Sequence, residues 1–451
     1  MGAEQPSLRC VRPVLSNLVA DHGEAQRLID FIDLAPSPYH AVAEVSSRLQ
    51  TQGFMLLDES EEWPAESGRY LVIRGASLIA WDNKPDSHPF SGFRIVGAHT
   101  DSPNLRIKPQ PDAGSSGFRQ LGVEVYGSAL LNSWLDRDLG VSGRVSLRDG
   151  DRPTTQLLRV DRPLLRIPQL AIHLDRGVNE QGVKLNPQQH LTPLWSLGPP
   201  DEGEFRRFLA KELGTTEDAV LAWDVMAHDL APGAVLGLDD EFVSSPRIDN
   251  LASCHAATRA LIDQIDIEDW SGDAPGIPVI SLFDHEEIGS QSATGADGTF
   301  LTTVLERICA DAEVDRNGFH RSLATSMCVS ADGAHATHPN YPERHDSTHP
   351  ILVNGGPVLK VNANVRYATD AGTAARFELA CDAAGVPLQR FVSRTDMPCG
   401  STIGPVTAAR LGVPTVDVGI PQLAMHSARE LCGTQDPAWF VDALWAFLTA
   451  A

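Results

Sequence analysis

Five short segments of the chain place histidine and carboxylate side chains beside turns, where they could bind metal ions. The segments read GAHTDSP, SSPRIDNLAS, VISLFDHEEIGS, MCVSADGAHATH and QLAMHSARE. Their His, Asp and Glu side chains form a set of nitrogen and oxygen ligands with no cysteine at the candidate positions. Such a set suits zinc, manganese or cobalt in a catalytic site, whereas closed structural zinc sites favour four protein ligands with cysteine among them. The abundance of carboxylates points to two metal ions that share a bridging group.

The most informative segment is VISLFDHEEIGS, in which an apolar run leads directly into Asp284, His285, Glu286 and Glu287. Open α/β sheets place their sites at the carboxyl ends of strands. Four ionisable residues at such a position are costly unless a cation compensates them. One carboxylate could bind a metal ion while its neighbour accepts a proton from metal-bound water. The alternative is that these residues form a solvated loop.

The other segments leave two interpretations open when each is taken alone. His99 follows an apolar run, and Asp101 could accept its second ring N–H, but the pair could also lie on the surface. Asp249 precedes a helical pattern, where a carboxylate ordinarily caps the helix, although it could bridge two cations. Asp332 ends another apolar run, and a lone histidine such as His426 is more often structural than a ligand.

The elements that must position these residues follow from the apolar pattern. Helical patterns cover residues 25–50, with a break at Pro36 and Pro38, and residues 251–265. Apolar runs bounded by turns predict buried strands at 69–80, 93–98, 277–284 and 413–420. Residues 105–245 alternate in polarity, with many turns and one helix near 202–213. We therefore expect an α/β domain (1–104 and 246–451) that is interrupted by an inserted β-rich domain (105–245).

Charge and composition exclude several classes of partner. The 451 residues carry a formal net charge of −23, which disfavours nucleic acid and anionic membranes as partners. The same charge repels acidic substrates at long range, so a preference for them would need a local cation. No apolar run reaches the roughly 18 residues of a membrane span, and the first residues lack a secretory signal. Seven scattered cysteines without a CxxC pair suit a reducing compartment, and we expect a cytoplasmic location.

Six motifs in register resemble the M18 metallopeptidase family and, within it, the aspartyl aminopeptidases. They are GAHTDSP, PRIDNLAS, DHEEIGS, SADGAHATHPNY, PCGSTIGP and QLAMHS, and the resemblance extends from FIDLAPSPYHAVAE to QLAMHSARE. It implies a catalytic α/β domain with a mixed sheet flanked by helices, interrupted by an inserted β-rich dimerisation domain. It also implies a hydrolase with two divalent metal ions per subunit, zinc first and manganese or cobalt as alternatives.

The resemblance assigns a role to each residue of the candidate metal site. His99 and Asp332 would bind one metal ion, Glu287 and His426 would bind the other, and Asp249 would bridge them.

Two further residues would serve catalysis. Glu286 would be the general base, and Asp101 would orient His99. The free amino group of a peptide could bind one metal ion, which would restrict cleavage to the N-terminal residue.

The substrate pocket follows from the same resemblance. Lys360 would face the carboxylate of an N-terminal Asp or Glu, with Tyr367, His335 and Met425 also binding the substrate. The alternative for Lys360 is a strand face exposed to water. Two alternatives to an acid-specific enzyme stay open: an M18-type aminopeptidase of broader specificity, and a catalytically silent scaffold that binds peptides.

Assembly enters through His173, which lies inside the inserted segment. The resemblance implies that this histidine reaches the active site of a neighbouring subunit, in a homo-oligomer of dimers that forms a tetrahedral dodecamer. A purely structural role is the alternative. Two residues depart from the family pattern without touching a proposed ligand: Met397 stands where a threonine is expected, and Gly333 where a larger residue is common.

Overall fold

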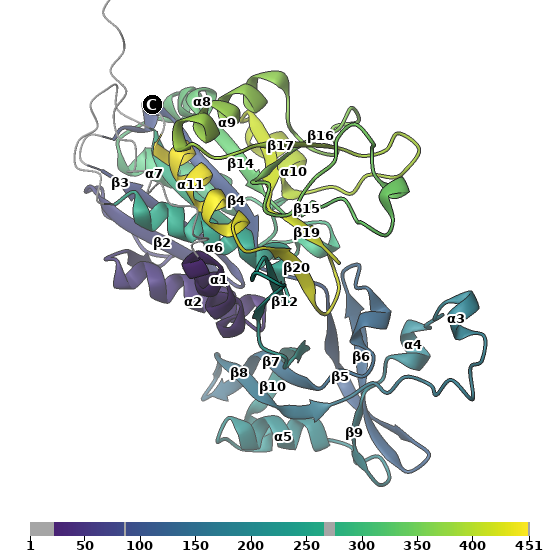
Figure 1. The fold of residues 1–451 in the computed structure, drawn as a ribbon. Coiled ribbons are helices and arrows are strands. Elements are labelled where there is room, and N and C mark those ends of the chain that lie inside the picture. Colours follow the sequence, from purple (N-terminus) through teal and green to yellow (C-terminus); the bar gives the residue numbers. More distant parts are fainter. Residues whose placement is uncertain (1–21, 85–86, 266–275, 450–451) are drawn as a thin grey trace, which may run out of the picture.

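The computed structural model describes residues 22–84, 87–265 and 276–449. Its centre is a nine-stranded mixed sheet in the order β1-β2-β3-β13-β4-β14-β18-β16-β17 (Figure 1). Strands β13, β4, β14 and β18 run parallel to one another, and β3 and β16 flank them in the antiparallel direction. The strand bounds are β1 Met55–Leu57, β2 Gly68–Arg74, β3 Ser77–Asn83, β4 Phe93–His99, β13 Ile277–Phe283, β14 Met327–Ala331, β16 Val358–Val361, β17 Gln389–Val392 and β18 Thr415–Gly419.

Helices cover both faces of this sheet because its central strands are apolar on both sides. In β4, Val96 and Ala98 pack against one group of helices, while Phe93 and Ile95 pack against the other. The first group comprises α1 His22–Leu34, α2 Pro38–Thr51, α6 Ile248–Asp263, α9 Ala371–Ala384 and α11 Asp436–Thr449. The second comprises α7 Phe300–Asp311, α8 Arg316–Thr325 and α10 Ile403–Leu411. The predicted α/β class with a mixed sheet is confirmed, and strands buried on both faces explain the unbroken apolar runs.

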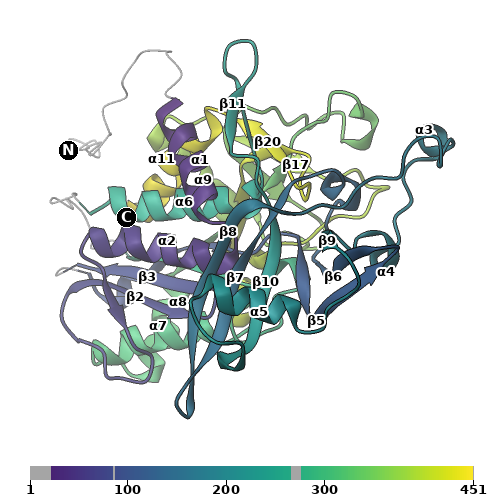
Figure 2. The same ribbon diagram turned by 90° about the horizontal axis from the view of Figure 1, so that it is seen from below.

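Residues 104–229 build a separate antiparallel sheet of six strands in the order β8-β7-β10-β5-β6-β9. Helix α5 Glu204–Glu212 packs on it, and Figure 1 shows this sheet beneath the nine-stranded one. The peripheral segment with α3 Val178–Gln181 and α4 Pro187–His190 extends away from the body of the molecule (Figure 2). The strands are β5 Asn104–Ser115, β6 Phe118–Tyr126, β7 Leu139–Asp149, β8 Arg152–Leu165, β9 Leu194–Leu197 and β10 Val220–Asp229.

A small five-stranded sheet joins segments from distant parts of the chain in the order β11-β12-β20-β19-β15. Strand β12 pairs with β20, so residues 242–245 lie beside the C-terminal part of the chain. The bounds are β11 Ala234–Leu236, β12 Phe242–Ser245, β15 Ala334–His335, β19 Pro421–Leu423 and β20 Glu430–Gly433.

One predicted strand was wrong in its extent. The run 69–80 is not a single strand but the hairpin of β2 and β3, because the chain turns at Gly75, whose φ is +62°. The predicted helical break at Pro36 and Pro38 is confirmed, since α1 ends at Leu34 and α2 begins at Pro38.

Two further observations bear on the environment of the chain. Within the described residues, no helix is both long and apolar enough to cross a membrane. The six cysteines of the same residues carry free thiols, and all except the half-buried Cys399 are buried.

Candidate metal centre

Three neighbouring parallel strands deliver side chains to one edge of the nine-stranded sheet. His99 is the last residue of β4, and it stands in register with Phe283 at the end of β13. Glu286 and Glu287 lie in the short 3₁₀ turn that follows β13, and Asp332 follows β14. This edge is formed by the carboxyl ends of the parallel strands, where α/β sheets place their sites. The sequence segments that end in charged residues therefore meet at one place.

Two further residues come from outside these strands. Asp249 lies at the beginning of α6 and His426 in the connection between β19 and β20. Asp249 has non-helical dihedral angles, its peptide bond to Asn250 is cis, and Arg247 occupies the N-cap position of α6. The helix-cap alternative for Asp249 is wrong, because its carboxylate points toward His99 and His426 instead of toward the N–H groups of the helix.

The five candidate ligands form two groups that share Asp249. The Nε2 atom of His99 lies 3.4 Å from Asp249 Oδ1 and 3.4 Å from Asp332 Oδ1. The Nε2 atom of His426 lies 3.4 Å from Asp249 Oδ2 and 3.4 Å from Glu287 Oε2. Within each group the potential ligand atoms lie within 4.8 Å of one another. The two oxygens of Asp249 therefore face two different ligand groups, as a bridging carboxylate would.

The chemistry of this cluster fits divalent cations. No Lys or Arg of the described residues lies within 4.0 Å of these carboxylates, so their charge faces only the two histidines. The atoms Asp249 Oδ1 and Glu287 Oε1 are buried and accept no hydrogen bond within the described part of the chain. Buried carboxylate oxygens without a partner are unusual unless an ion occupies the site. The donor set of His, Asp and Glu is that of a catalytic zinc site.

The pKa values of the two histidines report the same negative potential. Burial alone would lower the pKa of His99, but the neighbouring carboxylates of Asp101, Asp249 and Asp332 outweigh it and raise that pKa well above its usual value. Burial likewise opposes protonation of His426, and Asp249 raises its pKa to about 9. A positive charge is therefore favoured at both positions.

Glu286 lies outside the two ligand groups that share Asp249, although a carboxylate oxygen of Glu286 lies within 4.8 Å of potential ligand atoms of His99 and Glu287. Burial raises its pKa to about 8, with the carboxylates of Asp332, Asp101 and Asp249 adding to the shift and His99 opposing it. A carboxyl group whose pKa lies near neutrality can both accept and return a proton.

Two supporting carboxylates hold the main chain and the ring orientation. Asp101 is fully buried and accepts the main-chain N–H groups of Glu286 and Glu287, each at 3.1 Å. The Nδ1 atom of His99 donates to the main-chain oxygen of Asp101 at 3.0 Å and lies 3.5 Å from its carboxylate. Glu430 accepts the N–H groups of Asp249 at 2.8 Å and of His426 at 2.7 Å. These contacts fix the histidine tautomer and the ligand-bearing turns.

Sequence reasoning missed Glu430, although it stands inside the segment QLAMHSARE, only four residues after His426. A carboxylate that binds main-chain N–H groups has no spacing signature. Sequence reasoning also missed Tyr126, whose hydroxyl donates to Asp101 Oδ2 at 2.6 Å from the other sheet. Nothing in the sequence links Tyr126, in a strand of the six-stranded sheet, with Asp101, 25 positions earlier in the loop after β4.

Three residues near the centre adopt left-handed backbone conformations that are rare outside glycine. Arg247, His285 and His426 have φ values of 58°, 67° and 66°. Such conformations cost about 1–3 kcal/mol each and concentrate at functional sites. Arg247 and His285 stand two residues before the candidate ligands Asp249 and Glu287, and His426 is itself a candidate ligand, so local strain accompanies the placement of these side chains.

Lys360 lies on β16 beside the centre, and its side chain is not exposed to water. The residue is 1% exposed, and its Nζ donates to the main-chain oxygens of Asp332 at 3.2 Å and Gly333 at 3.1 Å. Nζ also lies 5.1 Å from the ring centroid of the buried Tyr367. Among the described residues no carboxylate forms an ion pair with Lys360 within 4.0 Å, which is unusual for a buried cation. The water-exposed alternative for Lys360 is therefore wrong.

The remaining residues of the predicted pocket lie at different depths. Met425 is half-buried next to His426, and a Cβ atom at Gly333 would come within 3.1 Å of Met425 Cε, so a larger residue there would displace Met425. His335, on β15, is exposed. Met397 is 37% exposed. His173 is exposed in the peripheral segment between β8 and α3, which Figure 2 shows away from the body of the molecule, so the single chain does not bring it to the centre.

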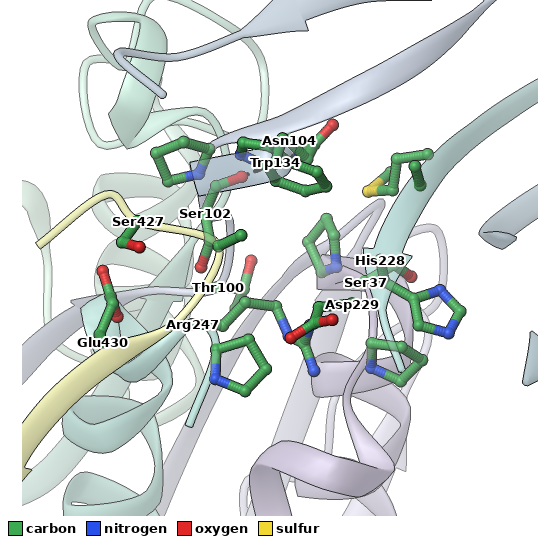
Figure 3. Close-up of a pocket in the computed structure, with 17 residues that line it drawn as sticks. Ser37, Thr100, Ser102, Asn104, Trp134, His228, Asp229, Arg247, Ser427 and Glu430 are labelled. Carbon is green, nitrogen blue, oxygen red and sulfur yellow. Dashed lines mark hydrogen bonds between the residues drawn. The ribbon is translucent and has the colours of Figure 1, made fainter. Parts of the chain in front are cut away.

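A pocket lies behind the centre, between the two large sheets (Figure 3). Thr100, Ser102, Arg247 and Glu430 line it from the side of the metal centre, and His228 and other residues of the six-stranded sheet line it from the opposite side. Its volume of about 30 Å³ is enough for one or two water molecules. None of the candidate metal ligands lines it, so it is separate from the space between His99 and His426.

The chain is similar to known proteins over nearly its whole length. The family model described as aminopeptidase I zinc metalloprotease (M18) matches residues 31–448. A probable M18 family aminopeptidase 2 from Streptomyces coelicolor is 52% identical over 429 residues, which are 95% of this chain and 98% of that protein. The relative of the same description from Mycobacterium tuberculosis H37Rv is 51% identical over 430 residues, 94% and 98% of the two chains.

Solved structures match to a similar extent. A chain of the cryo-electron microscopy structure of the Ape4 and Nbr1 complex is 37% identical and superposes with a TM-score of 0.92, covering 96% of this chain and 87% of that one. A dodecamer of mApe1 from S. cerevisiae is 28% identical with a TM-score of 0.82, covering 95% and 97%.

Proposed function

This chain belongs to the M18 family of zinc metallo-aminopeptidases, and from that premise we propose that it releases Asp or Glu from the N-terminus of peptides. Family membership makes it a metal-dependent exopeptidase of the hydrolase class. The preference for acidic residues rests on one observation above all, the buried ammonium group of Lys360 beside the metal centre, which has no carboxylate of the described residues within 4.0 Å.

The proposed ligands are His99 and Asp332 for one ion and Glu287 and His426 for the other, with Asp249 between them. The pairwise distances of 3.4 Å and the unpartnered oxygens of Asp249 and Glu287 support this division. Bound divalent ions would supply Lewis acidity, which lowers the pKa of a water molecule and polarises the peptide carbonyl. Zinc is the first candidate, with manganese and cobalt as alternatives that the same ligands would accept.

The proton transfers fall to Glu286. Its carboxylate accepts a proton as water attacks the peptide carbonyl, and it returns that proton to the leaving amine. Asp101 keeps His99 in the tautomer whose Nε2 faces Asp249 and Asp332, because the Nδ1–H bond is directed at the oxygens of Asp101. Asp101 also holds the turn that carries Glu286, so the base and one ligand share a support.

Lys360 supports selectivity through its free hydrogen-bonding capacity. An ammonium group has three donors, and the main-chain oxygens of Asp332 and Gly333 use two of them. The third donor is available to a substrate carboxylate. Since the side chain is buried, the attraction is screened little by salt and can overcome the repulsion from the net charge of −23. Tyr367, Met425 and His335 would complete the pocket around it.

We extend the proposal to assembly. One similar structure is a dodecamer, and in this chain the peripheral segment near His173 exposes Leu170, Ile172 and Leu174 at 57%, 46% and 75%. Apolar side chains at that exposure favour burial by a partner. In a homo-oligomer the exposed His173 would reach the centre of a neighbouring subunit.

The test is a panel of peptides that differ only in the N-terminal residue, assayed with the parent enzyme and with Lys360→Met. We expect the parent to cleave Asp and Glu peptides fastest and to lose activity with a chelator. Removal of one charged hydrogen bond should lower kcat/KM for acidic peptides about 10- to 100-fold. Values for neutral peptides should change only a few-fold. Lys211→Met, at an exposed lysine of α5, is the control and should leave the panel unchanged.

Three outcomes would contradict parts of the proposal. A parent enzyme that prefers Leu or Lys peptides would support the broader-specificity alternative and leave the metal chemistry intact. Equal losses on acidic and neutral peptides in Lys360→Met would assign Lys360 a structural role. Purified protein with almost no bound metal and no activity would favour the silent scaffold.

A further inference from the structure

Tyr126, the last residue of β6, and the next two residues, Gly127 and Ser128, contact three different parts of the metal centre from the side of the six-stranded sheet. We propose that residues 126–128 are positioning residues that orient the metal ligands from the six-stranded sheet. The inference rests on the proposed function only in assuming that the centre binds metal ions. It gives the inserted sheet a part in the reaction beyond the contact between subunits.

Tyr126 supports His99 through Asp101. The tyrosine hydroxyl donates to Asp101 Oδ2 at 2.6 Å, and the main-chain N–H of Glu287 donates to the same oxygen at 3.1 Å. Tyr126 and Asp101 are 6% and 0% exposed, so water does not replace the bond if it is lost. Burial and the nearby Asp101 raise the pKa of Tyr126, which keeps the hydroxyl protonated and able to donate.

Gly127 supports Glu287 through close approach. Its φ is +71°, and a Cβ atom built on it would lie 3.0 Å from Glu287 Cβ and 3.4 Å from Glu287 Oε2. The main chain of β6 therefore passes directly beside the ligand side chain and limits its movement. Any side chain at position 127 would press on Glu287.

Ser128 supports His426 with a main-chain atom. The Nδ1 atom of His426 lies 3.1 Å from the Ser128 carbonyl oxygen. A carbonyl oxygen only accepts, so Nδ1 carries the proton and Nε2 is left free toward Asp249 and Glu287. This is the same tautomer that Asp101 imposes on His99, and an outer partner of this kind orients a metal-binding histidine.

The six-stranded sheet holds this segment firmly. Tyr126 pairs with Asn104 of β5 across the antiparallel ladder, and the guanidinium of Arg106 lies 4.0 Å from the centroid of the Tyr126 ring. A cation over an aromatic face stabilises the ring position. The contacts with β5 and Arg106 therefore hold segment 126–128 in place, while its other contacts reach the metal centre.

The first test is Tyr126→Phe, which removes the hydroxyl and keeps the ring. Tyr70→Phe is the matched control, since Tyr70 is also 6% exposed and its hydroxyl donates to a main-chain oxygen, Glu66 O, at 3.0 Å. Zinc affinity of metal-free protein is measured by competition with a chromophoric chelator, and the cobalt-substituted protein by visible absorption. Tyr126→Phe should weaken zinc binding about 10-fold or more and shift the cobalt bands. It should lower kcat while KM for an Asp peptide stays within about twofold, because Lys360 is untouched.

The second test is Gly127→Ala, with Gly117→Ala as its control. Gly127 directly follows β6 and Gly117 lies in the turn between β5 and β6, both at positive φ, +71° and +82°, so alanine brings the same kind of backbone strain, but nothing lies within 4 Å of a Cβ atom at 117. Gly127→Ala should weaken zinc binding more than Gly117→Ala does. Arg106→Met, which removes the cation over the ring, should act in the same direction as Tyr126→Phe and remains informative if Gly127→Ala does not fold.

The results separate this inference from the proposed function. If the parent binds two zinc ions and Tyr126→Phe binds them as tightly as Tyr70→Phe, with unchanged cobalt bands, the positioning role is wrong and the proposed function stands. If the parent binds no zinc, both are wrong.

Discussion

The carboxylates of the candidate centre differ in their pKa values and therefore in their chemical roles. Asp249 keeps a lowered pKa because the neighbouring imidazoles of His426 and His99 outweigh its burial, so it remains an anion between two ligand groups. Glu286 has a pKa raised to about 8, mainly by burial. When neighbouring carboxylates have different pKa values, the one with the low pKa supplies a fixed negative charge and the one with the high pKa can transfer a proton.

Glu286→Gln tests this division directly. Glutamine keeps the shape of the side chain but cannot accept the proton, so we expect kcat to fall about 100- to 10,000-fold. Zinc content should match that of the parent, because the proposed ligands are intact. Metal analysis and steady-state kinetics on an Asp peptide measure both quantities. Turnover close to that of the parent would refute Glu286 as the proton acceptor.

The sequence predicted site residues where a charged residue or a histidine followed an apolar run. His99, Asp332 and the Glu286–Glu287 pair all stand at such ends, and the structure brings them to one edge of the sheet. The supports Tyr126, Ser128 and Glu430 could not be found in this way. They act through a hydroxyl, a main-chain oxygen and contacts with main-chain N–H groups, none of which follows from local sequence.

A buried hydrogen bond between His255 and Glu24 ties helix α1 to helix α6, which carries Asp249 at its beginning. The Nε2 atom of His255 lies 2.6 Å from Glu24 Oε1, and Arg27 donates to Glu24 Oε2 at 2.8 Å. Burial alone would raise the pKa of Glu24, but the bonds from His255 and Arg27 lower it from 4.5 to about 2.

This pKa predicts an acid-dependent loss of stability. Since the folded pKa lies below the unfolded value of 4.5, the stabilisation is complete above about pH 4.5 and is lost as the pH falls toward about 2. The full effect is about 3 kcal/mol. Glu24→Gln should lower the urea midpoint most at pH 6 and progressively less toward pH 3. Glu44→Gln, in a half-buried i,i+4 pair with Arg48 on α2, should show only a small change. A constant difference between parent and Glu24→Gln across this range would contradict the assignment.

The elements of the catalytic part were largely predictable, and those of residues 104–229 were not. Buried strands such as β13 can be predicted from an unbroken apolar run, and the beginning of α2 can be predicted from its proline. The order β8-β7-β10-β5-β6-β9 depends on pairings between strands far apart in sequence. Register of that kind is decided by tertiary packing, so alternating polarity indicated a β-rich segment without its neighbours.

The single chain leaves His173 exposed in the peripheral segment between β8 and α3, and this segment extends away from the body of the molecule (Figure 2). If a neighbouring subunit receives it, His173→Ala should lower kcat about 100-fold or more, the order of effect of a group that stabilises developing charge. His190→Ala, at an exposed histidine of the same peripheral segment, should change little.

Mixing inactive variants distinguishes donation between subunits from a role within one. Reassembled mixtures of His173→Ala and Glu286→Gln subunits contain sites with an intact Glu286 and a donated intact His173. We expect such mixtures to regain part of the parent activity, measured on an Asp peptide after dissociation and reassembly. Mixtures as inactive as either variant would exclude donation.

The hydrogen bond between His426 and Ser128 affects how freely the amino acid at position 128 can change during evolution. Any amino acid at position 128 provides the same carbonyl oxygen, and the serine side chain itself is exposed. Codon changes there can accumulate without disturbing the histidine, whereas the adjacent Gly127 has no comparable freedom. A position that orients a ligand can thus drift among descendants and look dispensable in a survey of natural variation.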